Sequence, residues 1–262
     1  MTATRKKATE AQSLEVQIKE VAKSVMDVCV IGRSPLIYNS MSQKAKQTLL
    51  LPSGRKNAAE LALEPKHNPL KEFRDSTYKN LADGPTRLQV PSDMFKRAIM
   101  SAALDIPGAT KAKIGRLVYM LEDRIDLYGT PQIFQAITRN SGMDHTPDVR
   151  TRAIMPRWAC RFKIVFVKPL LNVTVVTKLV AAAGVLAGIG DWRVQKGGSY
   201  GQFEPCSDGD PEFLSILKEG REAQDAALKS PTAYDDETQK LLLWFESEVA
   251  NRGKREELSV AA

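Results

Sequence analysis

The sequence predicts an α+β protein, and three observations indicate this fold class. Apolar residues at Cys160, Phe162 and Ile164 alternate with basic ones, which is typical of a half-buried β-strand. The apolar segment 173–186 follows this strand and is long enough for a helix. The predicted elements follow one another in the order strand, helix, strand, strand, helix, strand, which is the ferredoxin-like pattern.

The N-terminal segment 1–22 is polar and charged, and we expect an arm outside the core. A strand is predicted over residues 25–32, where Gly32 stops it, and it continues after a turn through residues 34–37. The basic N-terminus has no apolar run behind it, so no secretory signal is expected. No run of about 18 apolar residues occurs, so no membrane span is expected either.

Residues 40–85 are rich in lysine and proline and separate two core elements. Ser42 is predicted to begin a short helix that ends near Leu50, and a second short helix is expected near residues 58–63. A connection of this length between core elements is typically functional. We therefore interpret residues 40–85 as an inserted loop region.

The next elements are also defined by local patterns. Residues 88–91 predict a short strand, and Ser92 is expected to cap a helix over residues 93–104. Residues 115–121 and 125–127 suggest the two strands of a hairpin. This part of the chain would supply one helix and part of one sheet.

Further strands are expected at residues 149–156 and 158–167, after a polar loop at residues 138–148. The pattern of residues 133–137 does not distinguish a strand from a helix. A short last strand is predicted at residues 202–204.

Two helices are predicted at the C-terminus, over residues 213–229 and 234–251, and form an appendage within residues 208–262. The net charge of the chain is +7, but from Asp208 onward thirteen acidic and seven basic residues give a net charge of −6. The rest of the chain is therefore strongly basic. A basic body with an acidic tail suits a protein that binds a polyanion.

The cysteines are scattered and odd in number, at Cys29, Cys160 and Cys206, as expected for buried thiols in a reducing compartment. The two histidines, His67 and His145, lie in polar loops. Neither residue type forms a cluster with the spacing of a metal site. No metal and no cofactor are expected.

The glycine-rich segment 188–203 is the strongest candidate for function. Glycine allows close approach of the backbone to a partner, and arginine or lysine beside aromatic residues suits single-stranded nucleic acid. Trp192 is expected either to stack on a base or to lie in the core beneath this segment. The candidate nucleic-acid-binding residues are Arg33, Lys96, Arg97, Arg150, Arg152, Arg157, Trp192, Arg193, Lys196 and Tyr200, with the loop glycines Gly188, Gly190, Gly197, Gly198 and Gly201.

In this order of segments the chain resembles RAMP proteins, the RRM-like backbone subunits of CRISPR effector complexes, and their phage-encoded relatives. The similar segments are the strand and turn of residues 28–37, the strand-to-helix step Val90-Pro91-Ser92 to Ala98, and residues 158–203, which end in Gly197-Gly198-Ser199-Tyr200-Gly201-Gln202-Phe203. The resemblance covers residues 25–205 in patches. The chain departs from it at Gln202, where arginine is common, and in the added C-terminal helices.

The resemblance implies an RRM-like core over residues 23–207 that binds single-stranded RNA along its backbone. It also implies subunits that stack head to tail, with the inserted loop as a thumb between them. The function expected is therefore non-catalytic binding of RNA or DNA, with self-association or other effector subunits as partners and no membrane. The compartment would be the cytoplasm of a bacterial host, if a phage or mobile element encodes the chain.

Two other functions stay open. The same fold could act through protein partners, for example by mimicking or blocking an effector subunit in antiviral defence. Some RAMP relatives also cleave RNA with a loop aspartate, and Asp75 and Asp83 fall in the insertion. A metal-independent ribonuclease would need a positioned acid and base, which His67 and His145 could supply only if the fold brings them together.

Overall fold

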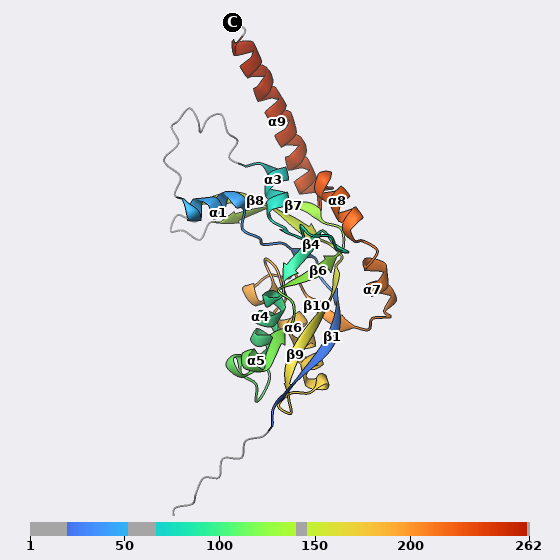
Figure 1. The fold of residues 1–262 in the computed structure, drawn as a ribbon. Helices are drawn as coiled ribbons and strands as arrows, with labels where there is room; N and C mark the ends of the chain where they lie inside the picture. The colour runs from blue at the N-terminus through green and yellow to red at the C-terminus, as the bar shows by residue number, and fades with distance from the viewer. Residues whose placement is uncertain (1–19, 52–66, 140–145, 261–262) are drawn as a thin grey trace, which may run out of the picture.

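The computed structural model describes residues 20–51, 67–139 and 146–260. The protein is a mixed α+β structure, as predicted, with a large curled antiparallel sheet, a small second sheet and helices around them (Figure 1). The predicted helix near residues 58–63 and most of the N-terminal arm lie outside the described residues.

The large sheet has seven strands in the order β10-β1-β9-β6-β4-β3, and β5 also pairs with β9. All printed pairings are antiparallel. The strands are β1 (Ala22–Gly32), β3 (Tyr78–Lys79), β4 (Leu88–Pro91), β5 (Val118–Met120), β6 (Arg124–Tyr128), β9 (Ala159–Lys168) and β10 (Phe203–Cys206).

The hairpin predicted around residues 121–124 is wrong. Residues 111–117 form the helix α5 (Lys111–Leu117), and β5 and β6 do not pair with each other. Both run along the same side of β9, with Val118 opposite Phe166 and Leu127 opposite Cys160. Residues 121–123 between them therefore interrupt one strand and do not form the turn of a hairpin.

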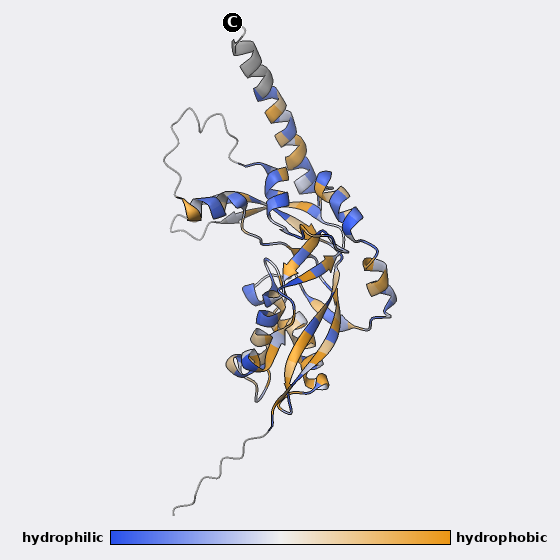
Figure 2. Cartoon of the chain, in the orientation of Figure 1, coloured by the Kyte–Doolittle hydropathy of each residue, from blue (hydrophilic) through white to orange (hydrophobic). Residues whose placement is uncertain are grey.

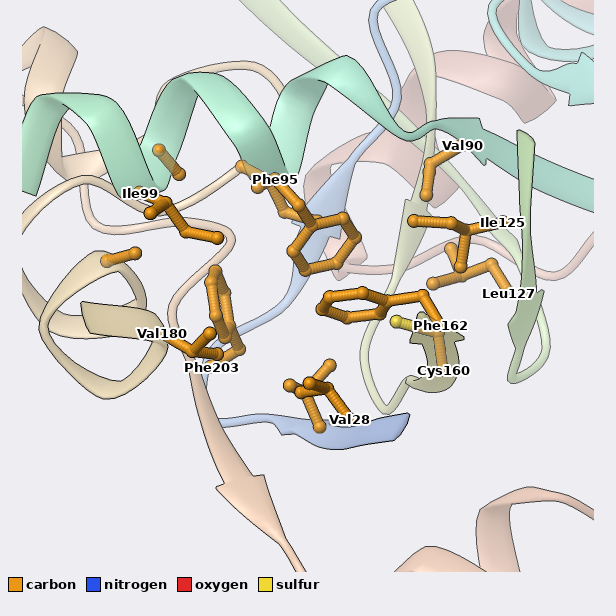
Figure 3. Close-up of a cluster of buried hydrophobic side chains, with 14 of the residues drawn as sticks. Val28, Val90, Phe95, Ile99, Ile125, Leu127, Cys160, Phe162, Val180 and Phe203 are labelled. Atoms are coloured by element: carbon orange, nitrogen blue, oxygen red, sulfur yellow. The ribbon is translucent and has the colours of Figure 1, made fainter. Parts of the chain in front are cut away.

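Helices α4 (Asp93–Ala102) and α6 (Val173–Leu186) cover one face of this sheet. The alternation along β9 is as predicted, because Phe162 and Phe166 are buried and Arg161 is exposed. Phe95 of α4 packs between Phe162 and Phe203, with ring centroids 4.5 and 5.2 Å away (Figure 3). This aromatic cluster joins the helices to the central strands.

The boundaries of several helices follow from their caps. The Ser42 hydroxyl accepts from the Ala45 amide and begins α1 (Gln43–Leu50) as predicted. The Asn172 side chain accepts from the Val175 amide at 2.9 Å and begins α6, whose bounds match the prediction. Helix α3 (Pro69–Asp75) follows the Asn68 cap, while α4 ends two residues early in the short 3-10 helix η1 (Ala103–Asp105).

The small sheet has the order β2-β8-β7 and contains β2 (Leu36–Ile37), β7 (Gln132–Arg139) and β8 (Pro147–Met155). The segment whose pattern was ambiguous is therefore a strand. Phe134 of β7 lies in an aromatic cluster with Trp192, Tyr200 and Tyr234. This cluster attaches both the glycine-rich segment and the C-terminal region to the small sheet.

The single helix predicted over residues 213–229 is wrong. The structure has α7 (Pro211–Ile216) and α8 (Arg221–Lys229), followed by α9 (Asp236–Val260). The chain bends at Gly220, where an added Cβ would lie 2.8 Å from the carbonyl oxygen of Pro85. The close approach of two backbone segments therefore separates the two helices.

A buried glutamine fixes α8 to the large sheet. Gln224 is fully buried, and its Oε1 accepts from the amides of Arg87 and Leu88 at 2.8 and 2.9 Å. Its Nε2 donates to the carbonyls of Leu127 and Gly129 at 2.7 and 3.1 Å. One side chain therefore satisfies four backbone groups of β4, β6 and their connections.

Within the described ranges, no helix is long and apolar enough to cross a membrane.

Candidate nucleic-acid interface

Two hollows meet at Tyr78, and we call them together the Tyr78 groove. The first, of about 360 Å³, lies between the start of α4 and the glycine-rich segment, and the second, of about 460 Å³, lies beside α1, α3 and β3. The basic lining residues are Arg97 and Arg193 in the first hollow and Lys46, Arg74, Lys79 and Arg124 in the second. The lining carboxylates are Asp93 and Asp75, so six basic side chains face two acidic ones.

Tyr78 lies at the edge of the large sheet, where β3 pairs with β4 and places Tyr78 opposite Gln89. Its hydroxyl donates to Asn39 Oδ1 at 3.1 Å, and burial raises the pKa of this phenol. The guanidinium of Arg124 lies 5.1 Å from the centre of the ring. An aromatic ring beside a cation can bind a base and its phosphate together.

Most of these cations stay accessible to an anion. Arg97 pairs with Asp93 at 2.7 Å, but its side chain is 77% exposed, and such surface pairs contribute little free energy. Arg193 donates to the carbonyl of Gly190 at 3.2 Å and is half-buried. Arg74 differs, because it donates to the carbonyls of Leu228 and Lys229. Five cations therefore remain as candidate phosphate ligands.

The glycines of residues 188–201 allow this segment to fold closely on itself. A Cβ at Gly198 would lie 1.7 Å from the carbonyl oxygen of Trp192, and one at Gly201 would lie 1.8 Å from that of Ile189. Only Gly188 and Gly190 line the Tyr78 groove. The segment therefore shapes one wall of the groove, and most of its glycines serve backbone packing.

Of the predicted binding residues, the groove brings together Arg97 and Arg193. Trp192 and Tyr200 lie instead in the aromatic cluster around Phe134. The ring centroid of Trp192 lies 6.1 Å from that of Phe134 and 6.2 Å from that of Tyr200. Of the two predictions for Trp192, the structure favours packing beneath the loop, although the ring is only half-buried. Lys196 is exposed in the 3-10 helix η2 (Val194–Lys196), outside the groove.

The other predicted cations do not line the groove. Arg33 forms ion pairs with Glu204 and Glu212, and Arg157 lies 3.6 Å from Glu219. The amino group of Lys96 lies 5.3 Å from the centre of the Tyr119 ring. Arg150 and Arg152 line a small recess beside Trp192, and Arg152 also donates to the Ser40 carbonyl at 3.3 Å. Burial lowers the pKa of Arg152, because removal of the guanidinium from water disfavours its charged form.

Of the residues now proposed as ligands, four were absent from the sequence-based set, namely Lys46, Tyr78, Lys79 and Arg124. Three of them lie in the predicted insertion, whose lysine content was noted without a specific site. The fourth was placed in the incorrect hairpin. The signal that could have identified them is a tyrosine followed directly by a lysine in a basic insertion.

The opposite face of the large sheet is a weaker candidate. A hollow of about 190 Å³ on this face is lined by three carboxylates and two cations, Asp27, Glu122, Asp126, Arg161 and Lys163. Elsewhere on this face α7 covers the strands with Phe213 and Ile216. Balanced charge gives a polyanion little attraction, so the Tyr78 groove is the better site.

Of the described candidates for catalysis, Asp75 alone lines the groove. Asp83 is exposed outside it, and no histidine is among the described residues of its lining. The ring nitrogens of His67 lie 2.8 and 3.0 Å from carboxylate oxygens of Glu72 and Asp148, away from the groove. His145 lies outside the described residues. In the described ranges no three potential ligands could hold a metal ion.

The chain matches no known protein-family model, and no curated protein matches it significantly. The interpretation of the groove therefore depends on its own geometry and charge.

Proposed function

We propose that the protein binds single-stranded nucleic acid, RNA in the first instance, without cleaving it, as a subunit of RAMP type. The observation that carries this proposal is the Tyr78 groove, whose two hollows are lined by five exposed or half-buried cations, one of which, Arg124, lies against the ring of Tyr78. Phosphate contacts supply most of the sequence-independent affinity, and a base can stack on tyrosine. A duplex offers no unstacked base to this ring, so we expect a preference for single strands.

The strand order supports the RRM-like part of the proposal. β10, β1, β9 and the interrupted strand β5–β6 lie side by side, all antiparallel. In the chain α4 lies between β1 and β5, and α6 lies between β9 and β10. Two interleaved strand–helix–strand units of this kind make a ferredoxin-like core. The three cysteines are free, which is compatible with the reducing cytoplasm assigned to such a subunit.

The test of this function is the salt dependence of binding to labelled single-stranded RNA, single-stranded DNA and duplex RNA of one length. If four phosphates are neutralised, affinity for a single strand falls about fiftyfold between about 50 and about 200 mM salt. Intact oligonucleotide after the measurement supports binding without cleavage. Absence of binding at the lower salt concentration, or equal affinity for the duplex, would overturn the proposal.

The ring of Tyr78 is expected to contribute to affinity separately from the charges. Replacement of Tyr78 by leucine keeps an apolar side chain but removes the stacking surface, and we expect affinity to fall between about 5- and 150-fold. Tyr78→Phe retains the ring and should bind within about threefold of the wild type, because it loses only the hydrogen bond to Asn39. Fluorescence anisotropy measures both.

Tyr119 provides the matched control for this substitution. It is 40% exposed and lies beside Lys23 and Lys96, but it does not line the groove. Tyr119→Leu should leave the affinity unchanged. If Tyr78→Leu and Tyr119→Leu have the same effect, the ring of Tyr78 is not the stacking surface.

A further inference from the structure

Two of the three cysteines lie directly opposite each other on neighbouring strands. In the register of β1 with β10, Cys29 pairs with Cys206, so both side chains project from the same face of the sheet. Helix α7, whose hydrophobic residues are visible in Figure 2, covers this face with Phe213 and Ile216 in the same cluster as Cys29. Both thiols are free, and Cys206 is half-buried, whereas the sequence predicted a buried thiol. The fold therefore places two free thiols side by side.

The third cysteine, Cys160, belongs to the opposite face of the same sheet. Its partner on β1 is Val30, the residue after Cys29, and successive side chains of a strand point to opposite faces. Cys160 lies in the large buried cluster with Phe95 and Phe162 (Figure 3). The sheet therefore separates Cys160 from the other two thiols.

The spacing of the two strands suits a strained disulfide bond. Opposite residues of antiparallel strands have Cα atoms about 4.5 or 5.5 Å apart, within the range of about 4.4–6.8 Å that disulfides span. Their Cβ atoms lie about 4.5–5.5 Å apart, against about 3.8 Å in a disulfide, so the strands must move closer. β10 is the edge strand next to β1 and can shift without disturbing another strand pair. Strained disulfides are reduced easily, which is typical of regulatory bonds.

A cation faces one of the two sulfur atoms. Nε of Arg161 donates to Sγ of Cys29 at 3.4 Å, so positive charge lies where negative charge must develop when this thiol reacts with an oxidant. Burial raises the pKa of the Cys206 thiol to about 12, and this group therefore stays protonated at neutral pH. Cys29 is only 8% exposed, so a small oxidant reaches it more readily than a bulky one.

We propose that Cys29 and Cys206 form a reversible redox site whose oxidant is a peroxide. The Cys29 sulfur attacks one oxygen of hydrogen peroxide, the O–O bond breaks, and Cys29 becomes a sulfenic acid while one water leaves. The Cys206 sulfur then attacks the Cys29 sulfur, the S–S bond forms, and the hydroxyl group leaves with the Cys206 proton as a second water. Two molecules of a small thiol reverse the oxidation and become one disulfide.

The bond would join the first and the last strand of the large sheet. In a reducing compartment such bonds are usually transient and redox-sensing. Neither cysteine lines the Tyr78 groove, so this inference goes beyond nucleic-acid binding and does not depend on it.

The experiment is treatment of the fully reduced full chain with hydrogen peroxide, followed by counting of free thiols and mass mapping of the peptides. We expect the wild type to lose two of its three thiols and to yield one linked pair of peptides, containing Cys29 and Cys206. No covalent dimer should appear on a non-reducing gel. Dithiothreitol should restore all three thiols, because a disulfide is reducible and a sulfinic acid is not.

The other cysteine provides the matched control. Cys160→Ser should form the bond as the wild type does, whereas Cys29→Ser and Cys206→Ser should each form none. Cys206 is only half-buried, so its variant should fold even if the more buried Cys29→Ser does not. Arg161→Gln should slow the oxidation at least about tenfold, because a hydrogen bond from a charged donor is lost, and Arg161→Lys should retain most of the rate.

Three results would overturn the proposal. The wild type could keep all three thiols at a peroxide concentration that oxidises free cysteine, the linked peptides could contain Cys160 or come from two chains, or dithiothreitol could fail to restore the thiols. An unchanged rate in Arg161→Gln would contradict the role given to Arg161.

Discussion

Replacement of both Arg124 and Arg193 by glutamate is expected to lower affinity for a single-stranded oligonucleotide about a thousandfold. One of these cations lies in each hollow of the Tyr78 groove. Charge-assisted contacts to phosphate contribute about 2 kcal/mol each, and two of them amount to about a thousandfold in affinity. The salt dependence should also become weaker, because fewer counterions are released on binding.

The control for this prediction changes the net charge equally at another place. Lys111 and Lys113 are exposed on α5 and line neither hollow. Their double replacement by glutamate makes the same change in total charge. If binding depends on the groove, this control should lose less than about tenfold in affinity, through the long-range field alone. Equal losses in the two double variants would mean that the overall charge, and not the groove, holds the nucleic acid.

Replacement of Gly201 by alanine is expected to cost at least about 4 kcal/mol of the free energy of unfolding. Gly201 has φ +69°, and an added Cβ would lie 1.8 Å from the carbonyl oxygen of Ile189. Its amide donates to Pro35 at 2.8 Å, and its carbonyl accepts from the Ile189 amide at 2.9 Å. The three heavy atoms nearest to the added Cβ all belong to the backbone of Ile189, so no flexible side chain can move aside to relieve this contact. Urea unfolding followed by tryptophan fluorescence measures the loss.

Gly197, in the same segment, allows the cost of the positive φ to be measured separately from the cost of the close backbone contact. It has φ +78°, close to that of Gly201, but nothing lies within 4 Å of an added Cβ. Gly197→Ala therefore carries only the strain of a left-handed backbone, between about 1 and 2 kcal/mol. If both variants lose the same free energy, the close approach to Ile189 does not stabilise the fold.

The sequence correctly predicted those helices and strands that depend on the residues within them or directly beside them. The alternation along β9, the cap at Ser42 and the extent of α6 are encoded within a few residues, and the structure has them where the sequence predicted them. The hairpin failed because the pairing partner of β5 and β6 is β9, about 40 residues further along the chain. The residues between β5 and β6 resemble a turn, but they carry no information about the distant strand with which β5 and β6 pair.

The candidate site was predicted less completely for the same reason. Arg97 and Arg193 are among the residues that the sequence predicted, but no local pattern distinguished Tyr78 or Arg124 as ligands. These residues meet because β3, β4 and β6 are adjacent in the sheet, which no short segment reveals. Conversely, Arg33 looked available in the sequence, but β10 and α7 bring Glu204 and Glu212 to its guanidinium.

The contacts of Gln224 imply an order of events when the chain folds. The side chain of Gln224 follows its four backbone partners by 95 to 137 residues in the chain. These partners are the amides of Arg87 and Leu88 and the carbonyls of Leu127 and Gly129. Until α8 is synthesised, four backbone groups at the start of β4 and the end of β6 lack their final partner, and water must solvate them. The last quarter of the chain therefore completes this part of the sheet, and a growing chain cannot satisfy these strand ends before its synthesis is nearly finished.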